Sequence, residues 1–186
     1  MIEVVEYDEA WPGLFEQLRD TYAAALGSAG VPFVAIEHVG STAVPRLAAK
    51  PVVDCDIVVA QRDVEAASAV LVALGFRPVG ELGIPQRWAF KHPADSPRTH
   101  TYVVVDGSLA VRNHLAVRDA LRADATLRDE CATVKRRVAT TAADIDEYGQ
   151  GKNAMVQEIL RAAGLSDDER ASIDANQVPS RDEVPR

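Results

Sequence analysis

Cysteine is scarce in this chain, which has only Cys55 and Cys131 among its 186 residues. The two lie far apart and lack the close pairs typical of zinc ligands, so the sequence favours neither a disulfide scaffold nor a structural zinc site. Few cysteines without such a pattern are typical of proteins from reducing compartments. We therefore expect a cytoplasmic location.

Long apolar runs are also missing. No stretch of about 18 consecutive apolar residues, the length that spans a bilayer, occurs in the sequence. The N-terminus begins Ile2-Glu3-Val4-Val5-Glu6 rather than with a basic region followed by an apolar run. We expect no association with a membrane.

Positive charge is in short supply, because 20 Lys and Arg residues face 28 Asp and Glu residues, for a net charge of −8. Contacts between basic side chains and phosphates dominate nucleic-acid binding, so this balance argues against general binding of nucleic acid. A local basic pocket for a small anion remains compatible with an acidic surface.

Hydrophobic residues make up 47% of the chain, which is enough for one sizeable core. We expect a single domain over residues 1–165. From Ser166 to Arg186 the sequence lacks the apolar spacing needed for packing, which predicts a disordered C-terminal tail.

Hydrophobic periodicity predicts an α/β protein of the α+β kind, with helices and strands in the first part of the chain and a helical portion after them. The expected helices cover residues 9–26, 62–74, 111–123, 126–140 and 144–163. The expected strands cover residues 33–39, 52–59, 76–79, 87–91 and 99–105, the last two being paired. Residues 45–51 are expected to form a loop or a short helix.

Two acids, Asp54 and Asp56, interrupt the apolar strand 52–59. The period of two along a strand puts both side chains on one face, with their Cα atoms roughly 6–7 Å apart. A hard divalent cation such as Mg²⁺ or Mn²⁺ offsets both their desolvation and their mutual repulsion. We interpret Asp54 and Asp56 as metal ligands; the alternative is a solvated sheet face.

A turn of small residues, Gly40-Ser41-Thr42, precedes the acids by about a dozen positions. Glycine lets backbone N–H groups approach phosphate oxygens, and a hydroxyl adds a hydrogen bond. Gly-Ser alone marks many ordinary turns. Its spacing from the two acids favours a site for a nucleoside triphosphate and its metal.

These residues belong to a longer stretch that resembles the GrpB family of nucleotidyltransferase-like proteins. The resemblance covers about residues 4–163, and its motifs are Val5-x-Tyr7-x-x-x-Trp11-Pro12, the segments 38–56 and 112–122, Lys135, Tyr148 and Gly151-Lys152. It implies a nucleotidyltransferase-like mixed sheet, with the Gly-Ser turn and the Asp-x-Asp strand at the site. It implies a fold more firmly than a reaction.

One segment departs from the family pattern. The strand that usually carries His-x-His reads His100-Thr101-Tyr102 here, and no third carboxylate stands between Thr99 and Val105. His100 is a candidate catalytic residue, as metal ligand or general base, because imidazole binds divalent metals and titrates near neutrality. The alternative is a structural histidine.

Positive charges recur where the resemblance places them, and converging cations would form an anion pocket. The candidate nucleotide- and substrate-binding residues are Gly40, Ser41, Thr42, Arg46, Lys50, Arg87, Arg112, His114, Arg118, Lys135, Tyr148 and Lys152. Each cation is alternatively a surface charge or the partner of a nearby acid. Arg118 with Asp119, and Arg112 with His114, alternatively hold a helix to the sheet.

The leading hypothesis is a metal-dependent nucleotidyltransferase that moves a nucleotidyl group from a nucleoside triphosphate to a small-molecule acceptor. A second hypothesis is a non-catalytic module that binds a nucleotide or an anionic metabolite, which the missing third acid favours. A third is another activity on the same metal strand, such as phosphate-ester hydrolysis or ATP-dependent condensation on a small metabolite.

Overall fold

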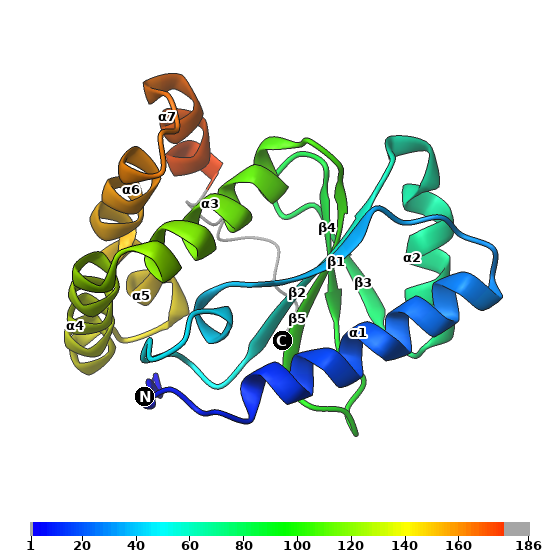
Figure 1. The fold of residues 1–186 in the computed structure, drawn as a ribbon, viewed down its shortest axis with the longest axis horizontal. Helices are drawn as coiled ribbons and strands as arrows, with labels where there is room; N and C mark the ends of the chain where they lie inside the picture. Colours follow the sequence, from blue (N-terminus) through cyan, green and yellow to red (C-terminus); the bar gives the residue numbers. More distant parts are fainter. Residues whose placement is uncertain (1, 177–186) are drawn as a thin grey trace.

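A five-stranded mixed β-sheet runs through the computed structural model, which describes residues 2–176 (Figure 1). Its strands are β1 (Ala35–Val39), β2 (Val53–Val59), β3 (Arg77–Gly80), β4 (Arg87–Lys91) and β5 (Thr99–Val105). They lie in the order β1-β2-β5-β4-β3, with β2 and β5 parallel and the other neighbours antiparallel. The predicted mixed sheet and the pairing of residues 87–91 with 99–105 are confirmed.

Successive side chains of β2 point to opposite faces of the sheet. Cys55 and Ile57 pack in a core with helices α1 (Trp11–Ser28) and α2 (Val64–Ala73). Val58 packs with Val111 of α3 (Leu109–Ala123) on the opposite face. Asp54 and Asp56 have the parity of Val58, so both acids face the α3 side of the sheet, as predicted.

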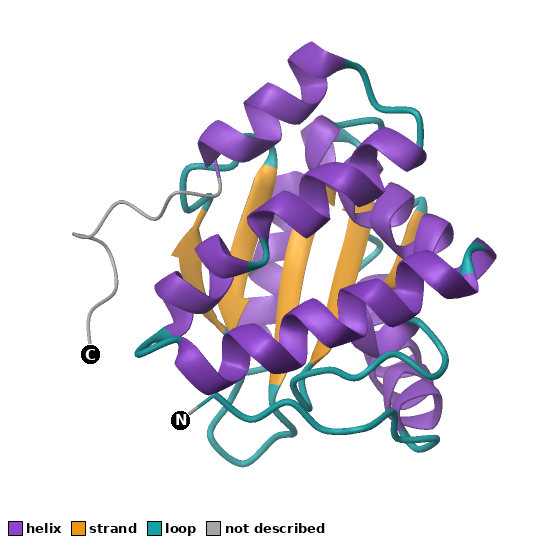
Figure 2. Ribbon diagram, turned by 90° about the vertical axis from the view of Figure 1, so that its left-hand side faces the viewer, coloured by secondary structure: helices purple, strands orange, loops and turns teal. Residues whose placement is uncertain are grey.

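A helical portion follows α3 and lies over that side of the sheet (Figure 2). Its helices are α4 (Ala125–Thr141), α5 (Ile145–Gly151), α6 (Asn153–Ala162) and α7 (Asp167–Asn176). Leu47 and Ala48 are fully buried in the core of this portion, against Cys131 of α4 and Ile159 of α6. The segment 45–51 is therefore a loop that joins the helical portion to the sheet.

Two predicted segments differ from the structure. The expected helix 144–163, in which Gly149 and Gly151 predict an interruption, is divided at Lys152 into α5 and α6. Helix α7 occupies residues that were predicted to be disordered; it is held by the buried side chain of Ile173 and an ion pair between Arg112 and Glu169. The rest of the predicted tail, residues 177–186, lies outside the described residues. Across residues 2–176, every helix is too short or too polar to cross a membrane.

Candidate active site

Asp56 of β2 has a fully buried side chain. Its Oδ2 accepts a hydrogen bond of 2.7 Å from Nδ1 of His114, which α3 supplies. Its Oδ1 is buried and has no hydrogen-bond partner within the described residues. A buried carboxylate oxygen without a partner is costly, so a cation that reaches it would be bound favourably.

Asp54 lies nearer the surface and accepts a hydrogen bond of 2.8 Å from Nδ1 of His100. Burial tends to raise the pKa of Asp54, but the hydrogen bond and the charge of His100, with the charges of His114 and Lys152, hold the pKa below its usual value. Asp54 is therefore ionised at neutral pH.

His114 and Asp56 form a coupled pair. Burial tends to lower the pKa of His114, but the negative charge of Asp56 and the hydrogen bond to it outweigh burial and raise that pKa above its usual value. A proton on His114 offsets part of the charge of Asp56. Each acid of β2 thus has one imidazole beside it.

The parallel pairing of β2 with β5 decides which side chains flank the acids. Asp54 pairs in register with His100, and Asp56 pairs with Tyr102. The two β5 positions beside the acids are therefore an imidazole and a phenol rather than a third carboxylate. In residues 2–176, no group of three or more His, Cys, Asp or Glu side chains is placed to hold a metal ion.

Gly40 brings the Gly-Ser turn against Asp54. Its φ of 69° and ψ of −167° lie in a region that is essentially restricted to glycine. A Cβ atom added at Gly40 would lie 2.2 Å from Oδ2 of Asp54. The absence of a side chain therefore allows the turn and the acid strand to meet.

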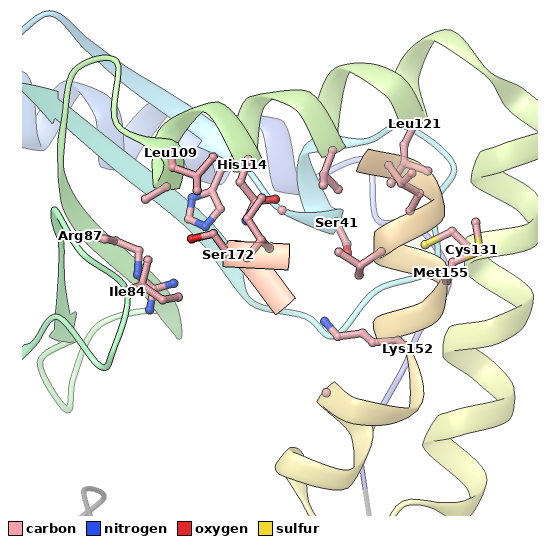
Figure 3. Close-up of a pocket in the computed structure, with 18 of the residues that line it drawn as sticks. Ser41, Ile84, Arg87, Leu109, His114, Leu121, Cys131, Lys152, Met155 and Ser172 are labelled. Atoms are coloured by element: carbon pink, nitrogen blue, oxygen red, sulfur yellow. The ribbon is translucent and has the colours of Figure 1, made fainter. Parts of the chain in front are cut away.

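Two adjoining chambers open at this junction. The smaller, about 290 Å³, has polar walls that include Ser41, Lys50, Asp54, His100, Lys135 and Lys152. The larger, about 590 Å³, extends between α3 and the C-terminal helices, and its walls are mostly apolar (Figure 3). The residues common to both chambers are Gly40, Ser41, His114, Lys135 and Lys152.

Three lysines give the smaller chamber its positive charge. The ammonium groups of Lys50 and Lys152 lie 5.8 Å and 5.4 Å from the ring centre of Tyr148. Lys135 is almost fully buried and donates a hydrogen bond of 2.7 Å to the carbonyl of Ala48; burial lowers its pKa to about 8. The hydroxyl of Tyr148 is buried without a partner among the described residues. Together the lysines give this chamber a local positive charge in an acidic protein.

The structure gathers most of the predicted site residues. Those lining the smaller chamber are Gly40, Ser41, Lys50, Asp54, His100, His114, Lys135, Tyr148 and Lys152. Arg87 lines the larger chamber instead. Thr42 and Arg46 line neither: Thr42 is buried and hydrogen-bonded to Nε2 of His38 at 3.0 Å, and Arg46 is exposed.

Arg112 and Arg118 also lie outside both chambers and form structural ion pairs. Arg112 pairs with Glu169 of α7. Arg118 donates to Glu37 at 2.6 Å and to Asp119 at 2.7 Å, and so joins α3 to β1. The contacts of Arg118 match the alternative in which it holds α3 to the sheet, whereas Arg112 is the partner of an acid in α7 rather than of His114 or the sheet.

The apolar walls of the larger chamber were not predicted. They include Val117 of α3, Val134 of α4, and Met155 and Val156 of α6. On helices with ordinary amphipathic spacing such residues look like core positions. Tyr102 lines the smaller chamber and was not predicted as a site residue either. The sequence pointed to this position, because the family usually has a second histidine there.

Comparisons with known proteins identify the family of this chain. Residues 1–162 match the model of the family described as GrpB protein. The chain is 33% identical to the UPF0157 protein YqkA of Bacillus subtilis, over 84% of this chain and 45% of that protein. It is 35% identical to the UPF0157 protein SCO7215 of Streptomyces coelicolor, over 89% of this chain and 86% of that protein. The chain thus spans less than half the length of YqkA.

Solved structures show the same fold. The crystal structure of the conserved protein GrpB from Enterococcus faecalis superposes with a TM-score of 0.76 and 28% identity, over 87% of this chain and 96% of that one. The Cid1 poly(U) polymerase bound to MgGTP superposes with a TM-score of 0.57 and 15% identity, over 80% of this chain and half of that one. The second likeness shows a nucleotidyltransferase-like fold, and the family match shows that this chain belongs to the GrpB family.

Proposed function

We propose that this protein transfers a nucleotidyl group from a nucleoside triphosphate to a small-molecule acceptor in a metal-dependent reaction. The observation that carries the proposal is the position of Asp54 at the wall of a chamber lined by Gly40, Ser41 and lysines, with Asp56 buried on the same face of β2. Acids that bind a metal and cations that bind phosphate are both needed for this reaction, and here they adjoin.

The donor set fits a Mg²⁺ or Mn²⁺ ion. Mg²⁺ is commonly bound by one or two carboxylates together with water and substrate phosphates, so a third protein ligand is not required. Asp54 and Asp56 would hold the ion, and the buried Oδ1 of Asp56 offers it an unshared oxygen. The bound ion would supply electrostatic stabilisation of the phosphate charge.

The protein's own groups would bind and orient the triphosphate. Backbone N–H groups of the Gly40-Ser41 turn, with Lys135 and Lys152, would neutralise its phosphates. The acceptor oxygen forms a bond to the α-phosphorus, the bond from that phosphorus to the bridging oxygen breaks, and pyrophosphate leaves. The proton of the acceptor passes to a base, for which His100 beside Asp54 is the candidate.

A second function, nucleotide or metabolite binding without catalysis, is favoured by β5. Its positions beside the acids are His100 and Tyr102, so the strand offers no third carboxylate to activate a nucleophile. This function predicts ligand-induced stabilisation without release of pyrophosphate.

The test is incubation of the protein with Mg²⁺ or Mn²⁺, each ribonucleoside triphosphate and a pool of small metabolites. Pyrophosphate and the melting temperature are both measured, with Asp54→Asn as the matched variant. Pyrophosphate that disappears in a folded Asp54→Asn protein supports transfer. Metal-dependent stabilisation without pyrophosphate supports the binding module, and the absence of both signals rejects a triphosphate site.

A further inference from the structure

Arg87 of β4 is a half-buried cation at the wall of the larger chamber. Its guanidinium lies 4.6 Å from the ring centre of Tyr102. Its Nε is buried without a hydrogen-bond partner, and no acid within residues 2–176 forms an ion pair with it. Asp54 and Asp56 are each hydrogen-bonded to a histidine instead.

The arginines of α3 differ from Arg87 in this respect. Arg112 pairs with Glu169, and Arg118 pairs with Glu37. Arg122 donates two hydrogen bonds, of 2.9 Å and 2.7 Å, to the carbonyl of Ala43. The Nε–H of Arg87 is a buried donor without a hydrogen-bond partner, which is costly, and a guanidinium presents a planar fork that matches carboxylate or phosphate. The position of Arg87 therefore points to an anionic ligand group.

The chamber next to Arg87 is shaped for an organic molecule rather than for a bare ion. Its volume of about 590 Å³ is that of a pocket for a small ligand. Leu109 and Val117 of α3, with Met155 and Val156 of α6, provide apolar wall. In Figure 3, Arg87 lies on one side of this chamber and Lys152 on the other, with Ser41 and His114 between them.

We propose that the larger chamber binds a small organic anion, with its carboxylate or phosphate on Arg87 and its apolar body along α3 and α6. The further step that this molecule is the acceptor rests on the proposed function. Its nucleophile would then lie near the junction of the chambers. The binding itself requires neither turnover nor metal. Arg87 and the lysines then form separate anion sites, one for each substrate.

The test measures binding of simple probes without nucleotide or metal. Phenyl phosphate, benzoate and the neutral benzyl alcohol are titrated by ligand-observed NMR into the wild type and Arg87→Gln. We expect at least one anion to bind more tightly than benzyl alcohol, and which one binds better separates phosphate from carboxylate. Arg87→Gln should weaken that anion about ten-fold or more, the cost of losing a charge-assisted hydrogen bond, and leave benzyl alcohol unchanged.

Two matched variants locate the effect. Arg77→Gln removes an exposed arginine of β3 outside both chambers, and Lys152→Gln removes a cation at the junction; both should keep the anion's affinity within about two-fold. Lys152→Gln should weaken ATP binding, so this variant tests the proposed triphosphate site independently of the anion site at Arg87. If Arg87→Gln does not fold, Arg87→Lys is used instead. It keeps the charge without the planar fork and should still lower the affinity for the anion.

Three results would overturn the proposal. The first is that neither anion binds the wild type more tightly than benzyl alcohol. The second is that the Arg87 variants bind the anion as the wild type does. The third is a loss caused by Lys152→Gln and not by Arg87→Gln, which would place the anion on the lysines.

Discussion

Gly40 is the residue whose replacement should disturb the site most directly. Gly40→Ala places a Cβ 2.2 Å from Oδ2 and 3.0 Å from Cβ of Asp54, in a backbone conformation unsuited to alanine. We expect a loss of about 2–4 kcal/mol in the free energy of unfolding by urea denaturation, together with loss of metal-dependent stabilisation. Gly30→Ala is the control, because Gly30 has φ +65° but open space around it, and should cost only about 1 kcal/mol. Equal losses would contradict the contact with Asp54.

His38 should make stability depend on pH. Burial, against the opposing charge of Asp54 and helped by Arg122 and Arg118, lowers the pKa of His38 to about 4. Between about pH 6.5 and pH 4, His38 is protonated in the unfolded chain but neutral in the folded protein, so the unfolded state binds one more proton. Stability is therefore complete above about pH 6.5 and falls as the pH approaches 4.

The expected size of this effect is about 3 kcal/mol. His38→Gln keeps a group able to hydrogen-bond to Thr42 but does not titrate. The unfolding free energy of the wild type, measured relative to that of His38→Gln, should decrease by this amount between pH 7 and pH 4. Parallel curves for the two proteins would contradict the assignment.

Local spacing predicted the shared face of Asp54 and Asp56, because the period of two along a strand is a property of neighbouring residues. It did not predict that His114 pairs with Asp56, since the two lie 58 positions apart and only the packing of α3 on the sheet brings them together. Thr42 lines neither chamber for a local reason, because its hydroxyl is hydrogen-bonded to His38, four positions earlier.

At the scale of elements, α5 offers a matched pair of glycines. A Cβ at Gly151 would lie 2.6 Å from Cγ1 of Val138 in α4, whereas a Cβ at Gly149 meets nothing within 4 Å. Gly151→Ala should lower the unfolding free energy by about 1–3 kcal/mol, because the helices must separate. Gly149→Ala should be neutral or stabilise by up to about 1 kcal/mol. Thermal and urea denaturation of both variants test this, and similar effects would show that α4 and α5 do not meet as described.

The elements that sequence predicted best are those with strong periodicity, namely the strands and the helices α1 to α4. Helix α7 was missed because its attachment depends on Ile173 and on an ion pair to another helix, and a lone apolar residue makes no periodic pattern. The interruption between α5 and α6 could be predicted from Gly149 and Gly151, because glycine weakens a helix interior, but the exact position of the break at Lys152 could not.

For the molecule as a whole, the net charge of −8 opposes a polyanionic partner. Although the fold resembles that of the Cid1 poly(U) polymerase, we expect the Kd for oligo(U) to exceed about 0.1 mM at physiological salt. Fluorescence polarisation of a labelled oligo(U) measures this, with ATP as the comparison ligand. Saturable binding at micromolar concentrations would contradict a small acceptor.

The two chambers also belong to this scale. The walls of the larger one come from the turn after β1, from β4, and from α3, α4, α6 and α7, so no local pattern in the sequence describes it. The smaller chamber was partly predicted, because its acids and its Gly-Ser turn lie close together along the chain.

The chamber wall also makes one thiol a chemical reporter. Burial raises the pKa of both thiols, but Cys131 borders the larger chamber whereas Cys55 lies in the core under α1 and α2. A small alkylating reagent should therefore modify Cys131 slowly and spare Cys55 until the protein unfolds, as peptide mass spectrometry would show. A molecule bound in the chamber would shield Cys131 and slow its alkylation. The alkylation rate would therefore measure the fraction of protein with an occupied chamber, without any assay of turnover.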